Sequence, residues 1–205
     1  MTQSGHSLAA EKAALRQLVL RKRAEMMPTQ RIEASLALVD FIDALPLPDG
    51  AVIAGFWPIR DEIDPRPLLD RLRARGHRLC LPVVLNPHMI FREFTRETEF
   101  VAGSFGIMEP AETSPEMRPD VLLMPLAAFD GLGNRLGWGK GYYDIAIAEL
   151  QKSGPVTCIG LAFQIQEADH VPNEPHDKPL DGILTEIGYR PFRPGAAGRS
   201  PSEAE

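Results

Sequence analysis

The stretch GNRLGWGKGYYD, residues 133–144, combines glycines with an arginine, a lysine and an aspartate. Glycines let a backbone turn sharply and approach a ligand closely. Lys140 can reach phosphate oxygens as a point charge, and Arg135 can bind them with its planar guanidinium. Asp144 falls in the first turn of an expected helix, where a carboxylate is favoured and can also coordinate Mg²⁺. The stretch therefore predicts a phosphate-binding loop; the alternative is a glycine-rich connection with a charged rim.

This loop differs from the two common nucleotide-binding motifs. Its lysine is not followed by Ser or Thr, as in a P-loop, and its glycines do not match the dinucleotide-binding fingerprint. Its position before a helix still favours phosphate, because helix N-termini present unpaired N–H groups and a positive dipole end. Gly137, Gly139 and Gly141 are the residues that would let the backbone close on such a ligand.

The helix expected over residues 7–25 carries two cations four residues apart, Lys12 and Arg16. Lys12 lies on the same stripe as Leu15 and Val19, because steps of three and four residues share a helix face. One interpretation is that the lysine stem packs while its ammonium extends into solvent. The other is that both cations face one phosphate chain.

Alternating helix and strand patterns predict an α/β domain with a mostly parallel sheet. Helical patterns cover residues 7–25, 29–45, 64–76 and 142–152. Apolar runs predict strands at residues 51–58, 77–84, 90–95, 120–129, 156–163 and 181–188. We expect a single domain over residues 1–190 and a disordered tail over residues 191–205.

Polar clusters follow three of these strands. They read GFWPIRDE (55–62), FDGLGNRLGWGKGYYD (129–144) and QIQEADHVPNEPHDKPLDG (164–182). In open α/β sheets, ligands bind beyond the carboxyl ends of the strands. We therefore expect the three clusters to converge on one site.

The composition narrows the class of protein. The 22 Lys and Arg against 28 Asp and Glu give a net charge of −6, which does not favour nucleic acid as a partner. The apolar runs are too short to span a membrane, and the N-terminus lacks the apolar core of a signal peptide. Cys80 and Cys158 each lie in an expected strand, which favours buried free thiols over a disulfide or a metal pair. We expect a cytoplasmic monomer with no nucleic-acid or membrane partner.

Four segments together resemble the 5-formyltetrahydrofolate cyclo-ligase (5,10-methenyltetrahydrofolate synthetase) family. They are KAALR (12–16), GFWPIRDEIDPRPLL (55–69), MPLAAFDGLGNRLGWGKGYYD (124–144) and VPNEPHDKPLDGILTE (171–186). They occur in the family's order and span most of the chain, and RLGWGKGYYD is the most specific of them. The resemblance implies a Rossmann-like α/β sandwich, with a mostly parallel central sheet and helices on both faces.

The resemblance also implies a reaction and its site residues. The reaction is the ATP- and Mg²⁺-dependent conversion of 5-formyltetrahydrofolate to 5,10-methenyltetrahydrofolate, with release of ADP and phosphate. By resemblance, Asp144 and Asp177 would coordinate Mg²⁺, while Arg135 and Lys140 would act in catalysis. The implied substrate contacts are Trp57, Glu62, Trp138 and Tyr142. The implied ATP contacts are Lys12, Arg16, Arg135, Leu136, Gly137, Trp138, Gly139, Lys140, Gly141, Tyr142 and Tyr143.

This reaction needs cations and carboxylates together. A formamide oxygen is a poor leaving group, and phosphorylation by ATP makes it a good one before N10 attacks the formyl carbon. Phosphoryl transfer depends on positioning and on charge neutralisation by cations and Mg²⁺. Magnesium usually takes one or two carboxylates together with phosphate oxygens and water. Glu62 can accept hydrogen bonds from the pterin edge, and Trp57 can stack on an aromatic ring of the substrate.

Several of these residues also have a purely structural interpretation. Asp61, Glu62 and Asp64 fit a solvated charge run, Trp57 fits a core residue at a strand end, and Asp177 fits a turn residue. For the whole chain, one alternative is a folate-binding homologue without turnover. Another is a different enzyme on a related fold, such as a phosphosugar isomerase or CoA transferase, which would not need an ATP loop with a magnesium pair.

Overall fold

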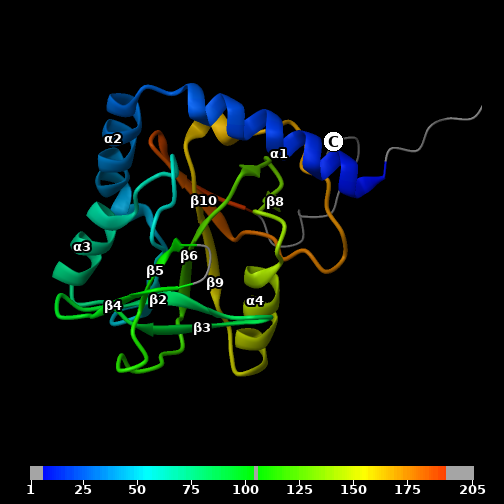
Figure 1. Cartoon of the computed structure of the whole chain (residues 1–205). Coiled ribbons are helices and arrows are strands. Elements are labelled where there is room, and N and C mark those ends of the chain that lie inside the picture. Colours follow the sequence, from blue (N-terminus) through cyan, green and yellow to red (C-terminus); the bar gives the residue numbers. More distant parts are fainter. Residues whose placement is uncertain (1–6, 104–105, 193–205) are drawn as a thin grey trace, which may run out of the picture.

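A computed structural model describes residues 7–103 and 106–192 of the chain, so residues 193–205 of the predicted tail lie outside the described residues. At its centre is a seven-stranded sheet, in which the five inner strands run parallel and each outer strand pairs antiparallel with its neighbour (Figure 1). In sheet order the strands are β11 (Gly188–Pro191), β10 (Gly182–Thr185), β9 (Thr157–Leu161), β6 (Val121–Pro125), β1 (Val52–Ala54), β2 (Arg78–Leu85) and β3 (His88–Glu93).

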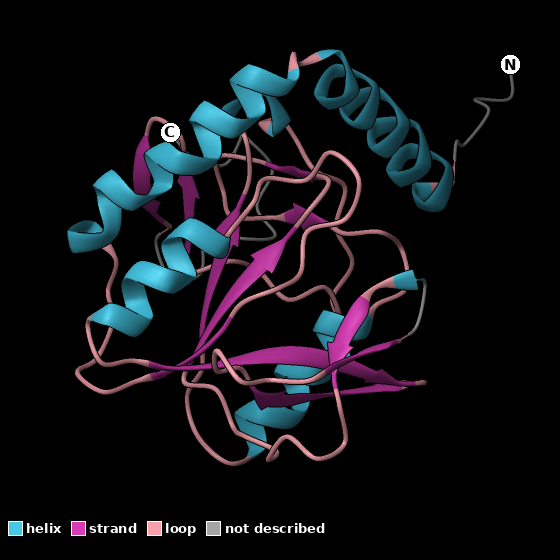
Figure 2. Cartoon of the chain, turned by 60° about the vertical axis from the view of Figure 1, so that its left-hand side comes forward, coloured by secondary structure: helices cyan, strands magenta, loops and turns pink. Residues whose placement is uncertain are grey.

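Helices cover both faces of this sheet. The helices of the described chain are α1 (Leu8–Glu25), α2 (Pro28–Ala37), α3 (Arg66–Ala74) and α4 (Tyr142–Lys152), with 3₁₀ helices η1 (Leu38–Ala44) and η3 (Gln164–Gln166). In Figure 1, α2 and α3 lie to the left of the sheet and α4 to the right; Figure 2 shows both layers from a view turned by 60°.

Strand β6 shows why two layers are needed. Its side chains alternate in direction, as in any strand, and all of Val121–Met124 are buried. Leu123 belongs to the hydrophobic cluster that contains Leu72 of α3, while Leu122 belongs to the cluster that contains Ile147 of α4. The predicted fold, with a mostly parallel sheet and helices on both faces, is confirmed.

Helix α1 differs from the other helices because it lies across the carboxyl ends of the parallel strands (Figure 1). Ser7 caps its start, with Oγ accepting from Ala10 N at 3.3 Å. Val19 is buried with Leu136 of the short strand β8 (Arg135–Leu136). The inner face of α1 thus rests on the loops that follow the strands.

The sequence pattern predicts the short elements less well. The helix predicted over residues 29–45 begins at Pro28 and becomes the 3₁₀ helix η1 from Leu38. The strand predicted over residues 120–129 ends at Pro125, because proline has no N–H to continue the ladder. The pairs β4 (Phe100–Ala102) with β5 (Met108–Pro110) and β7 (Ala128–Phe129) with β8, and the final strand β11, are too short to leave a recognisable alternation. Cys80 and Cys158 are buried free thiols, as predicted.

Candidate functional site

The cations of α1 lie against two of the polar clusters. Lys12 Nζ is 2.5 Å from Asp177 Oδ2 and 2.9 Å from Glu174 Oε2. Burial alone would lower the pKa of Lys12, but hydrogen bonds and charges from the two carboxylates outweigh burial and raise it above its ordinary value. Arg16 donates from Nε to the carbonyl oxygen of Gly137 at 2.8 Å. Lys12 is therefore an ion-paired group, and α1 joins the glycine loop to the segment of Asp177.

The glycine loop has the backbone geometry that its sequence predicts. Gly139 has φ +89° and Gly141 has φ +71°, a region that favours glycine. Gly141 also caps α4 in the left-handed conformation. Lys140, between them, is exposed and has no ion-pair partner within the described residues. The loop thus presents a cation that no described carboxylate neutralises, directly before a helix N-terminus.

The two segments that carry the predicted magnesium carboxylates are joined by a hydrogen bond. Asp144 Oδ1 accepts from Arg135 Nη2 at 2.7 Å and from the backbone N–H of Lys178 at 2.9 Å. Since Lys178 directly follows Asp177, this bond attaches the start of α4 to the segment that carries Asp177. In the described part of the chain, no group of three or more His, Cys, Asp or Glu side chains could hold a metal ion by itself. A two-carboxylate site suits Mg²⁺ only together with phosphate oxygens and water.

We call this group the strand-end site: Lys12, Arg16, residues 135–144 and residues 174–178.

The turn at the start of the glycine loop depends on Asp130, a residue that was not predicted from the sequence. This carboxylate is 1% exposed, and its Oδ1 accepts from Leu132 N at 2.9 Å and Asn134 N at 3.0 Å. Its Oδ2 accepts from Asn134 Nδ2 and Val171 N, both at 2.9 Å, so it fastens the glycine loop to the next polar cluster. The sequence signal was an Asp-Gly pair directly after an apolar strand, which is typical of a turn.

Glu62 belongs to a buried polar contact. Its side chain accepts from Trp138 Nε1 and from the backbone N–H of Ile59, both at 2.9 Å, and it is 8% exposed. Burial raises the pKa of Glu62, although the hydrogen bonds from Ile59 and Trp138 and the charge of Arg23 oppose this rise. The solvated-charge interpretation is therefore wrong for Glu62. The expected convergence of the three polar clusters is confirmed by these contacts.

The other predicted aromatic contacts occupy different surroundings. Trp57 is partly buried against Phe100, with ring centroids 5.0 Å apart, and the Arg66 guanidinium lies 5.3 Å from its ring centroid. No hydrogen bond or ring contact among the described residues joins Trp57 to Glu62 or Trp138. Tyr142 and Tyr143 are partly buried against the hydrophobic cluster under α4, and burial raises the pKa of Tyr143 well above its ordinary value.

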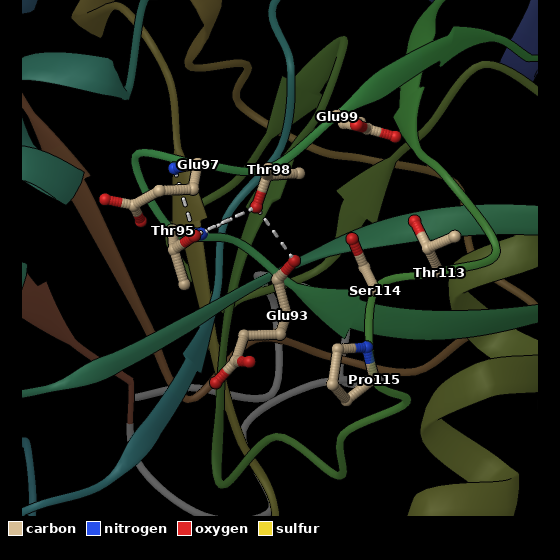
Figure 3. A pocket seen from close by; sticks show the side chains of 8 residues that line it. All are labelled: Glu93, Thr95, Glu97, Thr98, Glu99, Thr113, Ser114 and Pro115. Atoms are coloured by element: carbon tan, nitrogen blue, oxygen red, sulfur yellow. Dashed lines mark hydrogen bonds between the residues drawn. The ribbon is translucent and has the colours of Figure 1, made fainter.

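Two cavities lie elsewhere. One, of about 560 Å³, lies beside the C-terminal end of α1 and is lined by Lys22, Glu25, Met26, Gln30, Glu33, Ala34, Ala37, Ile165 and Glu186. The other, of about 310 Å³, we call the β3-edge cavity; it is lined by Glu93, Thr95, Glu97, Thr98, Glu99, Thr113, Ser114 and Pro115 (Figure 3). Neither is lined by a residue predicted from the sequence to bind substrate.

Within the described residues, no helix is both long and apolar enough to cross a membrane.

Comparisons with known proteins agree on one family. A model described as the 5-formyltetrahydrofolate cyclo-ligase family matches residues 8–186. The 5-formyltetrahydrofolate cyclo-ligase of Haemophilus influenzae is 34% identical over 140 residues, which are 64% of this chain and 74% of that protein. The enzyme of the same name from Escherichia coli strain K12 is 32% identical over 179 residues, 82% of this chain and 96% of that protein. The NMR structure of Aquifex aeolicus 5,10-methenyltetrahydrofolate synthetase matches with a TM-score of 0.74 and 30% identity, covering 95% of this chain and 99% of that one.

Proposed function

The chain belongs to the 5-formyltetrahydrofolate cyclo-ligase family, and we propose that it uses ATP and Mg²⁺ to convert 5-formyltetrahydrofolate to 5,10-methenyltetrahydrofolate, ADP and phosphate. One observation carries the ATP-dependent part of this proposal. Cations and carboxylates from α1, the glycine loop and the segment of Asp177 meet in the strand-end site, with Lys12 paired to Asp177 and Arg135 paired to Asp144. A triphosphate with its metal ion needs that mixture of charges.

The cations of the strand-end site would neutralise the phosphates. They are Lys12, Arg16, Arg135 and Lys140. Lys140 can contact a phosphate without first breaking an ion pair, because it has no ion-pair partner among the described residues. Arg135 is 6% exposed, and its Nε is buried without a hydrogen-bond partner among the described residues, which leaves one strong donor unused. A phosphate oxygen is a suitable acceptor for such a donor.

Asp144 and Asp177 fit a magnesium ion by the chemistry of their donors. Both are carboxylates, and the backbone N–H of Lys178 brings their segments together. When bound, Mg²⁺ would offset the negative charge of the phosphates and of the oxygen that leaves with ADP. Lys12 and Arg135, which now neutralise the two carboxylates, would then be free to contact phosphate.

The chemistry proposed for the folate is a two-step exchange. The formyl oxygen takes the γ-phosphoryl group and ADP leaves, which makes that oxygen a good leaving group. N10 then attacks the formyl carbon and gives up its proton, the C–O bond breaks and phosphate departs, so the ring closes. Glu62 and Trp138 would orient the pterin, because a buried carboxylate can accept hydrogen bonds from its amide-like edge. Cytoplasmic location, a monomeric state and the absence of a nucleic-acid partner stay predictions.

The test is to incubate the purified protein with folinic acid, with and without ATP and with and without Mg²⁺. We expect the near-ultraviolet absorbance of methenyltetrahydrofolate only when both are present. Lys140→Met should raise the KM for ATP by roughly tenfold, whereas Lys152→Met, an exposed lysine at the end of α4, serves as a control that leaves it unchanged. Product formation without ATP, or no product under any condition, would contradict the proposed function.

A further inference from the structure

Arg23 is a third cation on the inner face of α1, outside the strand-end site. It follows Arg16 by seven residues, about two helical turns, so both side chains lie on the same face. Its side chain is 1% exposed, and Nη2 donates to Asp61 Oδ1 at 2.8 Å. Within the part of the chain that the structure describes, its Nε is buried with no hydrogen-bond partner. Desolvating a guanidinium is costly, and one partly exposed partner does not satisfy it, so packing alone gives no reason for an arginine at this position.

The Arg23 guanidinium lies against the aromatic ring of Trp138, with Cζ 5.5 Å from the ring centroid. The same indole donates from Nε1 to Glu62 Oε1 at 2.9 Å. Asp61, the ion-pair partner of Arg23, directly precedes Glu62. Arg23 therefore contacts both sides of the Trp138–Glu62 hydrogen bond, through the ring of one residue and the chain neighbour of the other.

Trp138 needs such support because of its place in the chain. It stands between Gly137 and Gly139, and glycines restrict the backbone less than any other residue. Helix α1 holds this part of the loop at two points. Arg16 binds the carbonyl oxygen of Gly137, and Arg23 lies against the indole one residue later.

We propose that Arg23 is a positioning residue, which fixes the Trp138–Glu62 pair in the orientation that binds the pterin of the folate; this role rests on the function proposed above. The ring contact restricts the indole, and the ion pair with Asp61 restricts the loop that carries Glu62. Arg23 itself does not touch the reacting atoms. Its loss should weaken folate binding much more than ATP binding, because the Lys12 and Arg16 contacts stay in place.

The test compares Arg23→Met with Lys22→Met, a matched loss of charge at the adjacent, exposed position of the same helix. Three quantities are measured: the KM for 5-formyltetrahydrofolate, the KM for ATP, and the indole N–H NMR signal of Trp138, assigned with Trp57→Phe. We expect Arg23→Met to raise the folate KM about tenfold, as for loss of one charged hydrogen bond, and to shift the indole signal without any ligand present. The ATP KM should rise much less than the folate KM, and Lys22→Met should alter none of the three quantities.

Arg23→Lys keeps the charge but loses the planar guanidinium, so it should shift the indole signal and raise the folate KM less than Arg23→Met does. If Arg23→Met does not fold, Arg23→Lys and Asp61→Asn carry the same test. A wild-type indole signal and folate KM in the folded variants would overturn the positioning role, and so would equal increases in both KM values. A wild-type protein that forms no product would overturn the proposed function instead, and the indole signal would still report whether Arg23 fixes Trp138.

Discussion

The strand-end site and the β3-edge cavity offer a ligand opposite surroundings. The β3-edge cavity is a hollow of about 310 Å³ with three glutamates among its lining residues, which include no lysine or arginine in the described chain (Figure 3). The strand-end site combines cations from α1 and the glycine loop with carboxylates from α4 and the segment of Asp177. Both regions are polar, but only one of them has charges that suit a triphosphate.

This difference shows that a hollow in the surface does not by itself indicate where an anionic substrate binds. Of the three glutamates only Glu93 is paired with a cation of the described chain, Arg78, so the cavity repels phosphate. Lys140, which has no ion-pair partner among the described residues and precedes a helix N-terminus, attracts it. The ion pairs of the strand-end site also join segments that are far apart in sequence. Substitutions in the two regions should therefore have very different effects on catalysis.

The largest effect is expected for Asp177→Asn. The change removes one proposed magnesium ligand and leaves Lys12, which is 14% exposed, with only Glu174 as its partner. We expect kcat/KM at limiting Mg²⁺ to fall about a hundredfold, which corresponds to about 2.7 kcal/mol of transition-state stabilisation. Asp169→Asn, in the same segment and without an ion pair in the described residues, is the control. Unchanged activity at limiting Mg²⁺ would remove Asp177 from the metal site.

Lys12→Ala should have the next largest effect. It removes a cation from the proposed phosphate contacts, so the KM for ATP should rise or kcat should fall by about 1.5–3 kcal/mol, the range for a charged hydrogen bond. Initial rates over a range of ATP concentrations, together with thermal unfolding, measure this. Lys22→Ala, at an exposed position further along the same helix, is the matched control. A more stable Lys12→Ala protein with wild-type kinetics would mean that Lys12 has only a structural role.

Gly139→Val tests the backbone of the glycine loop. A β-branched residue at φ +89° is strained by about 1–3 kcal/mol, and its Cβ would also lie 3.4 Å from the Arg16 guanidinium. We expect weaker ATP binding, followed by amide NMR of residues 135–144 during an ATP titration. Gly131→Ala is the control, since its added Cβ meets no atom within 4 Å. If ATP perturbs this loop no more than residues 90–95, the loop does not bind phosphate.

Glu62→Gln should change the pH dependence of stability. Because burial raises the pKa of Glu62 in the folded protein, the unfolded chain loses this proton at lower pH than the folded chain. Wild-type stability should therefore fall as the pH rises from the ordinary glutamate pKa through the raised one, by about 1.4 kcal/mol for each unit between them. Glu62→Gln should lack this fall because an amide does not titrate, although its single oxygen replaces the two that accept from Trp138 and Ile59. Urea unfolding of both proteins between pH 4 and about 8 measures the difference, and parallel curves would contradict it.

The smallest effect is expected in the β3-edge cavity. Glu97→Gln should change unfolding free energy by less than about 0.5 kcal/mol and leave both KM values unchanged, because Glu97 is exposed and forms no ion pair in the described chain. Initial rates over a range of ATP and folate concentrations measure both KM values, and urea unfolding measures the stability. A rise in the folate KM comparable to that of Lys12→Ala for ATP would mean that this cavity takes part in binding substrate.

The sequence predicts local geometry well in this protein. Helix α4 covers the predicted residues 142–152 because Gly141 caps it, and α1 begins after Ser7, whose side chain bonds Ala10 N. Apolar runs identify every inner strand of the sheet to within a few residues. Such features depend on neighbours a few residues apart, so the chain encodes them locally.

The partners of the site residues could not be predicted in this way. The polar clusters indicate that Lys12 and Asp177 belong to one region, but their direct ion pair joins residues 165 positions apart. Asp130 and Arg23 are ordinary charged residues in the sequence. Only the packing of loops and α1 around them buries them and brings their hydrogen-bond partners within reach. Their hydrogen bonds form between segments that approach through space, and no local pattern marks these contacts.

The sequence by itself therefore determined the family, the α/β layers and the glycine loop whose backbone must turn through positive φ. Only the tertiary structure decided that Glu62 is buried and accepts a hydrogen bond from Trp138, and that Arg23 lies against the same indole. It also decided that each proposed magnesium carboxylate is paired with a cation. The physical reason is that backbone conformation follows from the residue type and its immediate neighbours. Burial, pairing and pKa depend instead on which distant groups the fold brings within hydrogen-bond distance.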